Sequence, residues 1–195
     1  MSVTASRLTL DSTTHFPLRI GHLSRPEIVR LLERSGVHLN ESAEVLLESK
    51  FFDALHDQTL CLVTRRVGQI PLVGDRSLSN ILEGARLSGV ELCPVTTGPY
   101  LRLALRDQPD APDSILSNGS APSGSMTVGS LRPGPGLPTG FYLRMIAGVP
   151  WLRGYHATVE HHWRSGDFLV FSTPCTSTSH RDIALEEAAL GPLNT

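Results

Sequence analysis

Apolar residues in the first half of the chain recur mainly at helical spacing. Three segments show this pattern, at 24–35, 40–52 and 77–88, and each starts at a Ser or Asn that can cap a helix. The first also has a capping box, because Glu27 follows Ser24 by three residues. Residues 58–67 are rich in β-forming side chains and predict a strand between the second and third helices.

The pattern in the second half predicts strands. Residues 99–105, 140–146, 150–159 and 168–173 alternate between apolar and polar positions or are rich in β-forming side chains. Residues 107–138 are instead dense in Pro, Gly and Ser, which is typical of a long loop. We therefore expect a flexible insertion between the first and second of these strands.

These elements predict an α+β fold. We expect N-terminal helices on one face of a mainly antiparallel sheet, formed largely by the C-terminal half. A single domain would cover 17–173 and include the insertion. Residues 1–16 would form a loose N-terminal arm and residues 174–195 a loose C-terminal tail.

A tripeptide of an aromatic residue, Leu and Arg occurs three times, at 100–102, 142–144 and 151–153. On a strand, residues i and i+2 share a face, so the ring and the guanidinium group would emerge together while Leu points toward the helices. The predicted binding residues on this open sheet face are Tyr100, Arg102, Tyr142, Arg144, Trp151, Arg153 and Tyr155.

Three interpretations of such a face stay open. It can be an ordinary solvent-facing cover of a sheet, an interface for an acidic protein segment, or a platform for single-stranded nucleic acid or a small anion. The chain has 17 basic and 19 acidic residues, and this balance argues against nucleic acid, which normally requires a basic excess. The leading hypothesis is a non-enzymatic binding or accessory module that recognises an acidic protein segment or another anion.

The alternative is a small hydrolase or transferase. Its candidate catalytic residues are His156, Glu160, His161 and Cys93. A zinc-binding HEXXH motif needs a helix and two histidines four residues apart, a spacing that residues 155–163 lack, so no metal site is expected. No glycine-rich phosphate or dinucleotide motif is present, and no cofactor is expected.

The cysteines bear on the compartment. Cys61, Cys93 and Cys175 are odd in number and match no zinc or CxxC spacing, so we expect free thiols in a reducing compartment, with Cys93 a buried structural thiol. No signal-peptide pattern begins the chain, and no apolar run approaches the roughly 18 residues that span a bilayer. The expected location is the cytoplasm, without membrane association.

Several short motifs form a larger pattern. They are GVHLNE at 36–41, ELCP at 91–94, GPYLRL at 98–103, QP at 108–109, GFYLR at 140–144 and WLRGY at 151–155. Through them, residues 24–55 and 70–171 resemble a family of small bacterial proteins of uncharacterised function. The resemblance implies a bacterial cytosolic domain and brings no activity, ligand or catalytic residue.

Overall fold

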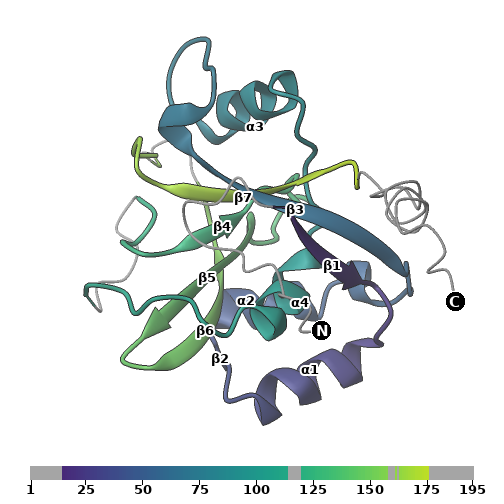
Figure 1. The fold of residues 1–195 in the computed structure, drawn as a ribbon. Coiled ribbons are helices and arrows are strands. Elements are labelled where there is room, and N and C mark those ends of the chain that lie inside the picture. Colours follow the sequence, from purple (N-terminus) through teal and green to yellow (C-terminus); the bar gives the residue numbers. More distant parts are fainter. Residues whose placement is uncertain (1–14, 114–119, 158–160, 162, 176–195) are drawn as a thin grey trace, which may run out of the picture.

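The computed structural model describes residues 15–113, 120–157, 161 and 163–175. A strongly curled sheet lies at the centre of this part of the chain (Figure 1). Among these residues seven strands follow the order β1-β3-β7-β4-β5-β6-β2. The strands are β1 (Phe16–Ile20), β2 (His38–Leu39), β3 (Gln58–Arg66), β4 (Met126–Val128), β5 (Gly140–Ile146), β6 (Val149–Tyr155) and β7 (Phe168–Thr173). The helices are α1 (Arg25–Arg34), α2 (Glu41–Leu47), α3 (Leu78–Leu87) and α4 (Thr97–Ala104), with short 3-10 turns η1 (Lys50–Phe52) and η2 (Val67–Gln69).

The sheet is mixed, which corrects the prediction of a mainly antiparallel sheet. The β2–β6 and β4–β7 pairings are parallel, and the β5–β6 hairpin is antiparallel. Three strands, β1, β2 and β3, come from the first half of the chain. They join strands of the second half, because β3 pairs with β7 and β2 pairs with β6. The α+β class is correct, but the sheet is assembled from both halves.

Helix starts follow the predicted caps. The Glu27 carboxylate accepts hydrogen bonds from the Ser24 backbone N–H (2.8 Å) and hydroxyl (2.6 Å), completing the predicted capping box of α1. The Asn40 side chain accepts from the N–H of Ala43 at the start of α2, and Ser77 caps α3 in the same way. The first three predicted helices are therefore confirmed, although α2 ends at Leu47 and only the η1 turn follows.

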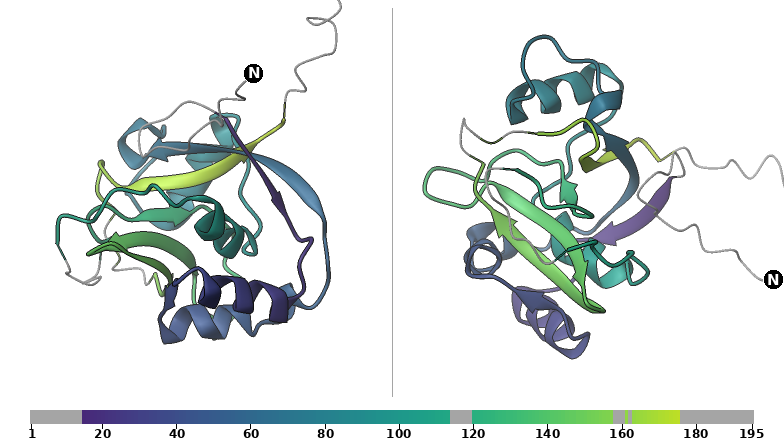
Figure 2. Two further views of the ribbon diagram at one scale, coloured as in Figure 1. Left: turned by 60° about the horizontal axis from the view of Figure 1, so that its bottom comes forward. Right: turned by 90° about the vertical axis from the view of Figure 1, so that its left-hand side faces the viewer.

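Helices cover both faces of the sheet, whereas the sequence predicted one covered face (Figures 1 and 2). On the face that we call the α4 face, α1, α2 and α4 enclose the larger core. On the opposite face, which we call the α3 face, Ile81, Leu82 and Ala85 of α3 pack with Leu169 and Phe171 of β7. The third helix therefore closes a second core rather than joining the first.

Residues 97–104 form helix α4, so the predicted strand at 99–105 is wrong. Pro99 lies in the first turn, where a missing N–H costs no hydrogen bond. Gly98 packs so tightly that an added Cβ would lie 2.7 Å from the Phe141 ring. Every residue from 97 to 102 is buried, and a segment buried all round loses the periodicity that separates helix from strand.

The predicted flexible insertion at 107–138 contributes to the sheet. Within it, β4 lies between β5 and β7 and is fully buried. The Gln108 amide donates to the carbonyls of Gly124 and Leu143, both at 3.1 Å, and the Ala111 N–H donates to Met145 O (2.8 Å). Residues 114–119 of the insertion, 1–14 of the predicted arm and 176–195 of the predicted tail lie outside the described residues.

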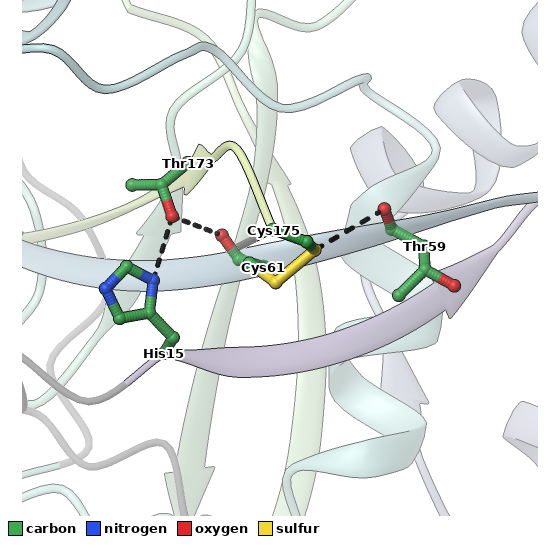
Figure 3. The surroundings of a disulfide bond; sticks show 5 residues. All are labelled: His15, Thr59, Cys61, Thr173 and Cys175. Carbon is green, nitrogen blue, oxygen red and sulfur yellow. Dashed lines mark hydrogen bonds between the residues drawn. A yellow bond between two sulfur atoms is a disulfide. The ribbon is translucent and has the colours of Figure 1, made fainter. Parts of the chain in front are cut away.

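The expectation of three free thiols is wrong for two of them. A disulfide joins Cys61 on β3 to Cys175, two residues after β7 (Figure 3). The sheet order places β7 beside β3 and so brings together residues that are 114 positions apart. Only Cys93 is a free, buried thiol, as predicted. Among the described residues, no helix has the length and apolar character needed to cross a membrane.

Candidate functional site

The aromatic–arginine face exists on β5 and β6, but it is not open. Tyr142 lies opposite Arg153, and Arg144 lies opposite Trp151. All four lie on one face of the sheet, as predicted, and this is the α3 face. However, only 4% of Tyr142 and 0% of Arg144 is exposed. The insertion covers them, because Arg144 Nη2 donates to Asp113 Oδ1 (2.7 Å) and Nε to Ser123 O (3.0 Å).

The β6 residues of this face are partly buried. The guanidinium group of Arg153 stacks on the Trp151 ring, 5.0 Å from its centroid. The ring of Tyr155 packs against Trp163 and His161, and burial raises the pKa of the Tyr155 hydroxyl. Tyr155 therefore joins β6 to His161 and Trp163, while Trp151 and Arg153 pack on each other, and the face is not the open recognition surface that the sequence predicted.

Tyr100 and Arg102 belong to α4 and are also buried. The Tyr100 hydroxyl accepts a hydrogen bond from the backbone N–H of Leu23 (3.0 Å). Arg102 donates to Gln108 Oε1 (2.8 Å) and to the carbonyl of Leu105, and burial lowers its pKa to about 10. Both residues therefore link α4 to neighbouring segments by hydrogen bonds, and their burial leaves no surface for a partner to contact.

The four catalytic candidates do not converge among the described residues. Cys93 donates to Val170 O (3.7 Å), and burial raises the pKa of its thiol to about 12, so it lacks the lowered pKa of a nucleophile. His161 is buried with its ring 4.8 Å from the Trp163 ring. Glu160 lies outside the described residues. Of the three candidates that the structure describes, only His156 is exposed and lines a cavity.

That cavity, which we call the α3 cleft, has a volume of about 680 Å³. This is within the roughly 300–1,000 Å³ range of ligand sites. Three leucines give it an apolar wall, and the polar side chains come from the start of α3, the 131–138 segment and the end of β6. The lining residues are Ser77, Leu78, Ser79, Leu82, Arg132, Gly136, Leu137, His156 and Ala157.

The start of α3 is fixed by its own side chains. The Asp75 carboxylate accepts from the Ser77 N–H (3.2 Å) and from the Asn80 amide (2.8 Å). Hydrogen bonding from the Ser77 side chain, from the Ser77 backbone and from Asn80 lowers the pKa of Asp75. The Ser77 hydroxyl accepts from the Asn80 N–H (3.4 Å) and lies 3.2 Å from the Ser79 hydroxyl. Two hydroxyl groups therefore line the cleft beside the partly positive end of a ten-residue helix.

A short network on the opposite wall positions Arg132. Its Nη2 donates to Ala157 O (2.6 Å) and to Thr139 Oγ1 (3.3 Å), and Thr139 Oγ1 also accepts from the Ala157 N–H (2.8 Å). Both of these Arg132 hydrogen bonds use Nη2. Nε and Nη1 therefore have no acceptor among the described residues, and both can donate to an anion.

The cleft combines a cation, two hydroxyl groups and a helix start with an apolar wall. None of the described residues that line it is Asp or Glu. A carboxylate or phosphate group is the chemical group that such donors bind best. Sequence reasoning identified the Ser77 cap and His156 but missed Arg132, which lies in a segment that composition alone marked as a loop.

Comparison with known proteins adds no assignment. No protein-family model, curated protein or solved structure matches this chain. The function therefore has to be argued from the α3 cleft, and the resemblance to a bacterial family stays a prediction.

Proposed function

We propose that this chain is a non-catalytic binding module whose α3 cleft holds an acidic protein segment. The observation that carries the proposal is the convergence of Arg132 and the Ser77 and Ser79 hydroxyls beside a leucine wall. The cleft replaces the β5–β6 face as the place of recognition, because the insertion covers that face.

The chemistry of the cleft defines the ligand in two parts. A carboxylate would accept hydrogen bonds from Nε and Nη1 of Arg132 and from the serine hydroxyls. An apolar side chain next to it would pack against Leu78 and Leu82. We therefore expect an Asp or Glu beside Leu, Ile or Phe in the bound segment. A cytoplasmic location and membership of the bacterial family stay predictions, and binding in the cleft requires neither.

The test is fluorescence polarisation with fluorescein-labelled hexapeptides that place Asp or Glu beside Leu, Ile or Phe. Matched peptides carry Asn or Gln in place of the acid. The Arg132→Met variant removes the guanidinium group and keeps an unbranched chain. Its control is Arg86→Met, because Arg86 is also exposed and lies near the other end of α3, paired with Glu83 (3.4 Å).

Acidic peptides should bind, and Arg132→Met should weaken binding by about tenfold or more, the loss expected when hydrogen bonds to a charged group are removed. Arg86→Met should leave the affinity within about twofold. Equal binding by wild type and Arg132→Met would refute the assignment. If benzoate or inorganic phosphate binds and no acidic peptide does, the cleft takes a small anion instead.

A further inference from the structure

The Cys61–Cys175 disulfide lies at the end of the β3–β7 ladder, outside both hydrophobic cores (Figure 3). Its Cα atoms are 5.2 Å apart, an ordinary separation for a disulfide. Cys175 is exposed, whereas Cys61 is partly buried within β3. A thiol in solution can therefore reach the bond from the Cys175 side.

The end of β7 is held in place without this bond. Ser172 pairs with Glu91 through two backbone hydrogen bonds of 2.7 and 2.9 Å, and on its other side with Leu62 of β3. The Leu169, Val170 and Phe171 side chains are fully buried. Opening the disulfide therefore removes one cross-link and leaves the β3–β7 ladder in place up to Thr173.

We propose that Cys61–Cys175 is a site of reversible thiol–disulfide exchange that opens and closes while the sheet stays folded. The co-reactant is a soluble thiol of the glutathione class. Its thiolate attacks Sγ of Cys175, the S–S bond breaks, and the Cys61 thiolate leaves and takes a proton from water. A second thiolate attacks the glutathione sulfur of the mixed disulfide and releases Cys175. Two glutathione thiols are oxidised to one disulfide, and the protein gains two thiols.

The third cysteine does not interfere with this exchange. Cys93 is 3% exposed and belongs to the core on the α4 face, so it has no path to either sulfur of the bond. Burial also raises the pKa of its thiol to about 12, which keeps it protonated and unreactive near neutral pH. The exchange therefore has two protein states and no competing pairing.

The experiment uses the full chain, purified without reductant and equilibrated in glutathione buffers from fully oxidised to fully reduced. N-ethylmaleimide then traps the thiols, and intact mass counts them. Far-ultraviolet circular dichroism follows the sheet in the same samples. Cys175→Ser removes the exchange, and Cys93→Ser is the matched control that keeps it.

We expect two maleimide groups to appear together as glutathione becomes reducing, and a third only in guanidinium chloride. The circular dichroism should not change, and the Cys93→Ser variant should show the same two-group transition. In Cys175→Ser the two-group transition should be absent, and at most one maleimide group, on Cys61, should appear. The proposal is overturned if the purified chain has no disulfide, if the bond opens only in denaturant, or if reduction abolishes the folded spectrum.

Discussion

Replacing Arg144 with Met should destabilise the fold strongly, although the sequence suggested a surface arginine. Its guanidinium group is 0% exposed and donates to the Asp113 carboxylate (2.7 Å) and to the carbonyls of Asp113 (2.8 Å) and Ser123 (3.0 Å). Methionine has a similar length but cannot donate any of these hydrogen bonds. The variant therefore loses the side-chain hydrogen bonds that hold Asp113 and Ser123 of the insertion against β5.

The expected loss can be estimated from burial. Breaking a buried ion pair from one side costs roughly 3–5 kcal/mol. The Asp113 side chain is 34% exposed, so water compensates part of the loss. We therefore expect the free energy of unfolding to fall by about 3 kcal/mol, the lower end of that range. With a urea m-value of about 2 kcal/mol/M, the midpoint should move by about 1.5 M.

Urea unfolding followed by tryptophan fluorescence measures this change. Arg19→Met is the matched control, because Arg19 pairs with Asp57 at 2.6 Å but its side chain is 62% exposed. Solvent screens an exposed pair, so Arg19→Met should move the urea midpoint much less than Arg144→Met. If the two variants shift the midpoint equally, burial of Arg144 contributes nothing to stability and the account of the covered face is refuted.

Three further changes test other parts of the fold. Gly154→Ala should lower the unfolding free energy by about 1–3 kcal/mol in urea titrations, because its Cβ would lie 2.5 Å from the Ser42 carbonyl carbon; an unchanged midpoint would contradict this packing. Burial raises the pKa of Asp167, so the folded state favours the protonated carboxyl group. The unfolding free energy of wild type, relative to that of Asp167→Asn, should therefore fall as the pH rises from 3 to 7, and a constant difference would contradict the shift. Cys175→Ser should lower the free energy of unfolding by about 2–4 kcal/mol in thermal or urea unfolding, and reduction of wild type should lower it equally. A loss in the variant or in reduced wild type alone would contradict a simple cross-link.

The local signals in the sequence were reliable where they depend on short-range chemistry. The capping box of Ser24 and Glu27 and the cap at Ser77 fixed the starts of α1 and α3, because a cap is made by residues within one turn. The alternation in β5 and β6 correctly separated Leu143 and Leu152 from the aromatic and arginine positions, because strand side chains alternate between faces.

The errors concern what packs on those elements. Alternation shows which face Arg144 occupies but not that Asp113 covers it, since that contact joins segments 31 residues apart. The Cys61–Cys175 pair depends on β7 lying beside β3, which cysteine spacing cannot reveal. The α3 cleft likewise needs three separate segments, so Arg132 had no local signal of function.

The position of β7 also constrains how the chain can fold. It is the only strand among the described residues that joins the β1–β3 pair to the β4-β5-β6-β2 sheet. Because β7 ends at Thr173, a ribosome must synthesise the chain through Thr173 before the two parts can meet. Until β7 emerges during translation, the β1–β3 pair and the β4-β5-β6-β2 sheet each expose an unpaired strand edge, and such edges promote aggregation.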